Sequence, residues 1–130
     1  MRALVETAHG VYTVDLETEE VEGLEEAARL DEPASVSTGL PRVVAAAASG
    51  STVIAVVETR PPLAVSHDAG RTWHQAGGGL PSGRAVAISP DEPELAVYAS
   101  RNRLYISRDG GRFWSALAPE LPEIKALDLE

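Results

Sequence analysis

Two copies of one eight-residue pattern, 41 positions apart, constrain this chain more than any other feature of its sequence. The first copy is residues 66–73 (SHDAGRTW) and the second is residues 107–114 (SRDGGRFW). Serine, aspartate, glycine, arginine and tryptophan occupy the same places in both copies. A fixed period near 40 residues, with a turn between two short apolar segments, is typical of proteins built from repeated β-sheet units. The sequence therefore predicts a repeat architecture.

The residue types of the pattern suit a tight turn between two strands. An aspartate side chain accepts hydrogen bonds from nearby backbone amides and fixes such a turn. The glycines supply positive φ angles, and the tryptophans are large enough to anchor the packing between sheets. We therefore predict a structural role for all the signature residues, which are Ser66, Asp68, Gly70, Trp73, Ser107, Asp109, Gly111 and Trp114.

The pattern resembles the Asp-box, Ser/Thr-x-Asp-x-Gly-x-Thr-Trp, of the BNR-repeat β-propellers. That family includes sialidases, sortilin-type receptors and photosystem II assembly factors. The first copy matches the box fully, whereas the second has Phe113 where threonine is usual. The resemblance implies propeller blades, with the boxes on the outer rim and away from any catalytic centre.

The repeat extends beyond the box. Leu80-Pro81 recurs as Leu121-Pro122. A degenerate third copy of the repeat lies at the N-terminal end of the sequence, 52 residues before the next copy instead of 41. We predict an all-β chain of three four-stranded blades. Blade 1 comprises residues 2–30 together with 123–130, blade 2 residues 42–79, and blade 3 residues 84–121. The larger offset places extra residues between the first two blades, where 24–30 has helical propensity.

The first blade lacks an innermost strand, while the segment Glu123–Leu129 aligns with an innermost strand and has no blade after it. Three blades are too few to close a ring, and unpaired strand edges favour aggregation. Since two-fold dimers are the commonest oligomers, we predict a homodimer that forms a six-bladed ring. Glu123–Leu129 would pair with Ala3–Glu6 of the other chain and so share a blade. A three-chain ring, a different partner chain and a fragment of a longer protein remain as alternatives.

Composition narrows the classes of partner. The 130 residues carry a formal net charge of −9, which argues against general nucleic-acid binding. The chain has no cysteine and hence no disulfide framework. No apolar run reaches the roughly 18 residues of a membrane helix. The chain enters a predicted strand without the apolar stretch of a signal peptide, so a cytoplasmic location is expected.

Basic residues recur at one end of the predicted blades. Arg42, Arg84 and Lys125 each follow a Leu-Pro element at the start of an innermost strand. The neighbouring loops between the second and third strands of the blades carry His9, Arg60, Arg101 and Asn102. Together these residues predict a site for an anionic ligand, such as a carboxylate, phosphate or acidic peptide, at the channel mouth. The alternative is that the basic residues are inherited with the repeat and pair with nearby acids such as Glu58.

For function we expect a non-catalytic binding or assembly module, similar in role to the photosystem II assembly factors. The alternative is a sialidase-like glycoside hydrolase or a carbohydrate-binding protein. Residues 60–62 (RPP) match the Arg-Ile-Pro element of sialidases only faintly, and the tyrosines fall in predicted strand interiors. His67 and His74 can approach each other, but no third ligand is indicated. No metal, cofactor or catalytic residue is therefore predicted.

Overall fold

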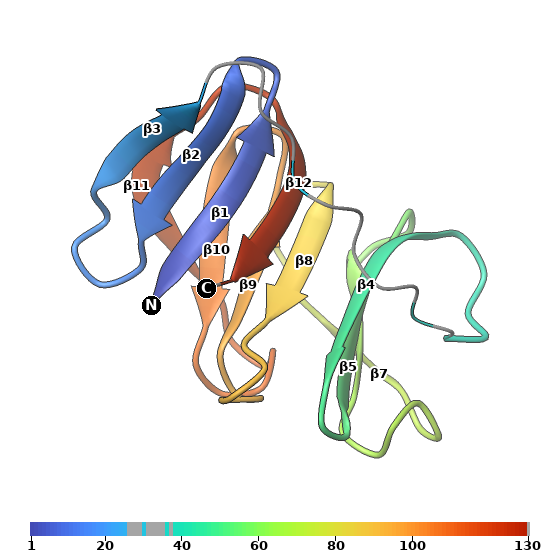
Figure 1. The fold of residues 1–130 in the computed structure, drawn as a ribbon. Coiled ribbons are helices and arrows are strands. Elements are labelled where there is room, and N and C mark those ends of the chain that lie inside the picture. The colour runs from blue at the N-terminus through green and yellow to red at the C-terminus, as the bar shows by residue number, and fades with distance from the viewer. Residues whose placement is uncertain (26–29, 31–35, 37, 130) are drawn as a thin grey trace.

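The chain forms three four-stranded antiparallel sheets, which we call blades (Figure 1). The computed structural model describes residues 1–25, 30, 36 and 38–129. Blade 1 has the strand order β12-β1-β2-β3, blade 2 β4-β5-β6-β7 and blade 3 β8-β9-β10-β11. Blade 1 contains β1 (Arg2–Thr7), β2 (Gly10–Asp15), β3 (Val21–Glu25) and β12 (Ile124–Leu129). Blade 2 contains β4 (Val43–Ser49), β5 (Thr52–Val57), β6 (Leu63–Ser66) and β7 (His74–Ala76). Blade 3 contains β8 (Ala85–Ile88), β9 (Ala96–Ala99), β10 (Arg103–Ser107) and β11 (Ser115–Glu120).

The innermost strands of blades 1, 2 and 3 are β12, β4 and β8. β8 lies between β4 and β12, so the three innermost strands are neighbours (Figure 1). In space the blades therefore follow the order 2, 3, 1. This arrangement confirms the predicted all-β class and the three four-stranded units.

Blade 1 is completed by the C-terminal strand of the same chain. β12 pairs antiparallel with β1, and the register places Ala3 opposite Leu129 and Glu6 opposite Ala126. The sequence analysis expected these two segments to pair between two chains and share a blade, whereas the structure pairs them within one molecule, because β12 of the same chain reaches the free edge of β1. The four strands of blade 1 are therefore all present within one molecule.

Blade 3 forms the centre of the apolar core. Val97 and Ala99 on one face of β9 pack in a cluster with blade 1, while Ala96 and Tyr98 on the other face pack with blade 2. Strands that are buried on both faces are apolar throughout rather than alternating, and β9 fits this description.

Blade 2 has one well-packed face. Ile54 and Val56 of β5 are fully buried against blade 3. The side chain of Val44 on β4 is 46% exposed. The alanines that follow Val44 supply little area to either face.

The segment between the first two blades differs in part from expectation. β3 continues to Glu25, so the predicted helix does not begin at residue 24. Residues 26–29 lie outside the described part of the chain. Within the residues that the structure describes, no helix is long and apolar enough to cross a membrane.

Candidate binding pocket at the end of the blades

The first signature turn, residues 66–73, joins β6 to β7. The hydroxyl of Ser66 donates to Asp68 Oδ1 at 2.7 Å, and the amide of Gly70 donates to Ser66 Oγ at 2.8 Å. Asp68 also accepts from the amide of Thr72 at 2.8 Å and from its hydroxyl at 2.5 Å. Gly70 has a φ of 88°, which a side chain would strain. The serine, aspartate, glycine and threonine of the pattern thus hold one turn together.

The second signature turn, residues 107–114, joins β10 to β11 in the same way. The hydroxyl of Ser107 donates to Asp109 Oδ1 at 2.8 Å, and the amide of Gly111 donates to Ser107 Oγ at 2.9 Å. The amide of Phe113 donates to Asp109 Oδ1 at 3.0 Å. Phe113 has no hydroxyl, so the side-chain bond of the first turn has no counterpart here.

These hydrogen bonds lower the pKa of both carboxyl groups. The hydroxyl and amide of Thr72 hold the pKa of Asp68 well below its usual range. The amide of Phe113 is the main cause of the lowered pKa of Asp109. A carboxylate that accepts several backbone hydrogen bonds is held in its charged form. Both aspartates are therefore poor candidates for a proton donor and well suited to fixing a turn.

Blade 1 builds its outer turn from a residue that the sequence reasoning overlooked. Asp15 Oδ1 accepts from the amides of Glu17 and Thr18 at 2.8 and 3.0 Å. The amides of Thr18 and Glu17 also lower the pKa of Asp15. An aspartate at the end of a strand is a signal for this Asx-type turn. Asp15 stands one position before Leu16, the residue that aligns with Asp68 at the offset of 52.

The two histidines of blade 2 connect neighbouring turns. The rings of His67 and His74 stack, with centroids 5.2 Å apart. His67 Nε2 lies 3.0 Å from the carbonyl oxygen of Gly110, so this nitrogen is the donor. Among the described residues, no group of three or more histidine, aspartate or glutamate side chains could hold a metal ion.

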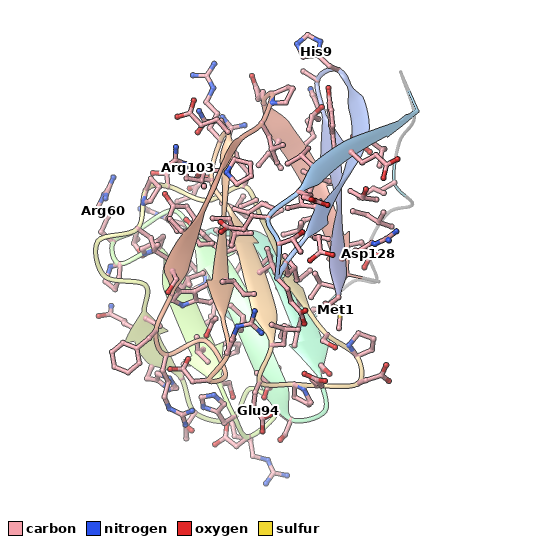
Figure 2. All side chains as sticks on the ribbon, turned by 90° about the vertical axis from the view of Figure 1, so that its left-hand side faces the viewer. Met1, His9, Arg60, Glu94, Arg103 and Asp128 are labelled. Carbon is pink, nitrogen blue, oxygen red and sulfur yellow. The ribbon has the colours of Figure 1, made fainter. Side chains whose placement is uncertain are left out.

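The end of the blades opposite the β4–β5 and β8–β9 turns carries the predicted binding residues. Backbone hydrogen bonds tie the loops together there, because the amide of Ala8 donates to Glu123 O and the amide of Glu58 donates to Arg42 O. The amide of Ile124 likewise donates to Arg101 O at 2.7 Å. Figure 2 shows His9, Arg60 and Arg103 toward this end and Met1 and Glu94 toward the other.

Two of the predicted cations converge on one glutamate. Arg84 Nη1 lies 3.7 Å from Glu123 Oε1, and Arg101 Nη2 lies 3.7 Å from Glu123 Oε2. A separation of 3.7 Å is a charge contact and is too long for a hydrogen bond. All three side chains are at least 40% exposed. Both guanidinium groups therefore keep donors that can reach an incoming anion.

A pocket of about 470 Å³ opens beside this group. Its lining residues are Pro81, Ser82, Arg84, Ser100, Arg101, Asn102, Arg103, Tyr105 and Glu120. Arg103 Nη2 donates to Glu120 Oε1 at 2.9 Å, a true hydrogen-bonded ion pair. Three arginines and one glutamate give the pocket a positive excess in a chain whose net charge is −9. We call it the arginine pocket.

The other predicted cations do not join the arginine pocket. Arg42 lines a separate hollow in blade 2. Arg60 and His9 lie on opposite sides of the molecule (Figure 2). Lys125 is exposed and stands at the irregularity in the β1–β12 pairing. The residue directly before β12 is Glu123, which takes the place that Arg42 and Arg84 hold before β4 and β8.

The acids at this end of the blades were missed by sequence reasoning. Glu123 and Glu120 are the partners of the arginines, whereas Glu58 was the partner considered. Glu120 and Glu123 flank Leu121-Pro122, so both acids lie beside an element of the repeat. The sequence did not indicate them as partners of the arginines, because neither acid recurs in blade 2.

Tyr98 fixes the wall between the arginine pocket and the core. Its hydroxyl donates to Pro81 O at 2.5 Å, and burial raises the pKa of Tyr98 to about 12. A Cβ at Gly83 would lie 2.3 Å from the Tyr98 ring. The tyrosine and the glycine together set the path of the chain into β8.

No protein-family model and no curated protein matches the chain. One solved structure, described as "YCF48 bound to D1 peptide", is similar in fold, with a TM-score of 0.51 and 20% sequence identity. The similarity covers 95% of this chain and 38% of that chain. At this identity it shows the fold alone, and it supports propeller-like blades. The chain spans little more than a third of the length of that protein.

Proposed function

We propose that this protein is a non-catalytic binding module that takes a carboxylate-bearing peptide segment into the arginine pocket. The observation that carries the proposal is the convergence of Arg84, Arg101 and Arg103 on one pocket of about 470 Å³. Arginine donates in a planar fork that matches a carboxylate. Ser82 and Asn102 add neutral hydrogen-bonding groups. The volume lies within the roughly 300–1,000 Å³ of ordinary ligand pockets.

The fold of the module is compatible with this role. The similar solved structure is that of a protein with a peptide bound. Exposed cations also increase the rate at which an acidic partner is captured, an effect that salt screens. We therefore expect weak to moderate binding that falls as the salt concentration rises.

The test is a fluorescence-anisotropy titration with a labelled glycine-serine peptide that ends in two aspartates. The control peptide ends in two asparagines in place of the two aspartates. Arg101→Gln should weaken binding of the acidic peptide about tenfold, because one charged partner of the carboxylate is lost. Arg108→Gln makes the same change in net charge at an exposed residue outside the pocket and should leave binding unchanged. Equal binding of both peptides, or equal loss in both variants, would contradict the proposal.

The non-catalytic part of the proposal has a separate test. A fluorogenic sialoside and a set of simple fluorogenic glycosides are incubated with the protein. We expect no turnover above the buffer rate. Turnover that disappears in an arginine-pocket variant would favour the glycoside hydrolase instead.

We also propose that two copies assemble into a six-bladed ring. The support is the exposed Val44 on the open face of blade 2, which a neighbouring blade would cover. Light scattering coupled to size exclusion should give twice the chain mass of 13.7 kDa. Val44→Glu should give the single-chain mass, because it places a charge in the contact. A monomer before substitution would contradict the ring.

A further inference from the structure

Blade 2 contains a second pocket that is the repeat copy of the arginine pocket. It has a volume of about 580 Å³ and is lined by Leu40, Pro41, Arg42, Val57, Thr59, Pro61, Leu63, Ala64, Trp73, His74 and Gln75. Four of these positions have a structural counterpart in the lining of the arginine pocket. The pairs are Pro41 with Pro81 in the Leu-Pro element, Arg42 with Arg84 directly before the innermost strand, Val57 with Ser100, and Ala64 with Tyr105. The two pockets thus occupy the same place in successive blades.

The two copies differ in chemistry. Where blade 3 has Ser100, blade 2 has Val57, and the loop that carries Asn102 in blade 3 carries Pro61 in blade 2. Where β10 carries Tyr105, β6 carries Ala64. The pocket with three arginines in blade 3 is therefore a mostly apolar pocket with one arginine in blade 2.

The two tyrosines of blade 3 explain why the blade 2 copy is larger. In blade 3 the rings of Tyr105 and Tyr98 lie 5.9 Å apart, and Tyr98 also packs on Trp114 with centroids 6.0 Å apart. Tyr105 lies opposite Tyr98 in blade 3, and the corresponding pair in blade 2 is Ala64 opposite Ala55. The missing rings leave a space beside Trp73 that the chain does not fill. We call it the tryptophan pocket.

A neighbouring blade does not close this kind of pocket. Blade 2 packs against the face of blade 3 that carries Tyr98, yet the arginine pocket remains open there. A blade beside the open face of blade 2 would occupy the corresponding place. The tryptophan pocket is therefore compatible with the proposed ring.

We propose that the tryptophan pocket binds an apolar side chain of the same peptide whose carboxylate enters the arginine pocket. This inference rests on the proposed function and adds a second determinant to it. The charges are complementary to such a segment, because the acidic part meets the arginines and the apolar part meets Val57, Leu63 and Trp73. An aromatic wall suits a leucine or phenylalanine side chain.

The spacing of the two determinants follows from the repeat. Packed sheets lie about 10 Å apart, and an extended peptide advances about 3.3 Å per residue. The apolar residue should therefore stand about three positions from the first acidic residue. A peptide with adjacent determinants cannot reach both pockets at once.

The experiment extends the anisotropy titration of the full chain. The probe peptides keep the two terminal aspartates and carry a single leucine one or three positions before them, or a serine in its place. We expect the three-position leucine peptide to bind about tenfold more tightly than the serine peptide, since a buried leucine contributes about 1.5–3 kcal/mol in full and only part of that here. Quenching or shift of Trp73 fluorescence should accompany this binding alone.

Substitution at the pocket separates the two proposals. Ala64→Tyr introduces the side chain that blade 3 carries and should remove the advantage of the leucine peptide while leaving the serine peptide unaffected. Ala64→Ser is the matched control and should keep the advantage. If Ala64→Tyr does not fold, Thr59→Phe at the exposed rim serves the same purpose.

The outcomes are distinct. Weaker acidic-peptide binding in Arg101→Gln, with no effect of leucine or of Ala64→Tyr, would overturn the tryptophan pocket and keep the proposed function. Absence of binding by every acidic peptide would overturn both. Binding of the leucine peptide that is not weakened by Arg101→Gln would show an apolar site that acts without the arginine pocket, and would overturn the proposal that one peptide enters both pockets.

Discussion

Blades 2 and 3 are copies of one repeat, but their innermost strands have different surroundings. β8 is buried along its length between β4 and β12, whereas β4 contacts a described blade on one side and leaves Val44 46% exposed. The side chains follow this difference, since β8 alternates alanine with valine and isoleucine while β4 has a run of four alanines. The position of a blade in the arc, rather than its repeat signature, sets how tightly it is packed.

The largest expected contrast between the blades concerns glycine. Gly83→Ala should lower the free energy of unfolding by about 3 kcal/mol, because the new Cβ would lie 2.3 Å from the buried Tyr98 ring. Gly78→Ala in the blade 2 to blade 3 connection meets no atom within 4 Å and should raise stability by about 0.5 kcal/mol. Urea denaturation measures both. Similar effects at the two glycines would show that Tyr98 can move aside.

The next contrast concerns core valines. Val97→Ala removes a fully buried side chain and should cost about 2 kcal/mol. Val44→Ala, on the exposed side of β4, should change the stability of the monomeric chain by less than about 0.5 kcal/mol. Thermal melting at low protein concentration checks the pair. A large effect of Val44→Ala would mean that the open face of blade 2 is covered in solution.

A smaller effect on stability is expected from a substitution that makes the second signature turn resemble the first. Phe113 is 79% exposed, so replacing it exposes no core. Phe113→Thr should add the hydroxyl bond that Thr72 makes to Asp68 and raise stability by up to about 1 kcal/mol. Phe113→Val has the shape of threonine without the hydroxyl and is the control. Equal stabilities of the two variants would exclude the hydroxyl bond as the cause.

The smallest expected effect is the difference in acid sensitivity of the two turns. The pKa of Asp68 and that of Asp109 are both lowered in the folded chain. Each carboxylate thus contributes stability above its unfolded pKa of about 3.9, and this contribution is lost as the pH falls further. Asp68→Asn should flatten the dependence of the melting temperature on pH between about 5 and 2 more than Asp109→Asn, because Asp68 also accepts the Thr72 hydroxyl. The opposite order would contradict the role of that hydroxyl.

The repeat signature allowed much of the fold to be predicted. A turn such as 66–73 is specified locally, by a carboxylate, a hydroxyl and a glycine within a few residues, so its position and those of its flanking strands could be predicted. The pairing of β12 with β1 was also predictable, because only these segments lacked a neighbour in the repeat. That the pairing closes within the chain could not be inferred from strand patterns, which are the same in either case.

The candidate site was less predictable. Arg84, Arg101 and Asn102 were identified because they recur near the blade ends, and the structure brings them together. Their partners Glu120 and Glu123 have no repeat counterpart and so gave no signal. The tryptophan pocket arises where Ala55 and Ala64 take the places of two tyrosines, and a cavity that forms through missing volume is not visible in a residue pattern.

The pairing of β12 with β1 has a consequence for the order in which the molecule is assembled. Among the described strands, β1 is synthesised first and β12 last, and the partners Ala3 and Leu129 are separated by nearly the whole sequence. Such distant contacts form slowly, because a long loop must be closed before they stabilise anything. Until then the inner edge of β1 has free backbone donors and acceptors, which other nascent chains can pair with. Blade 1 therefore reaches its final form after blade 3, although its first three strands leave the ribosome before all others.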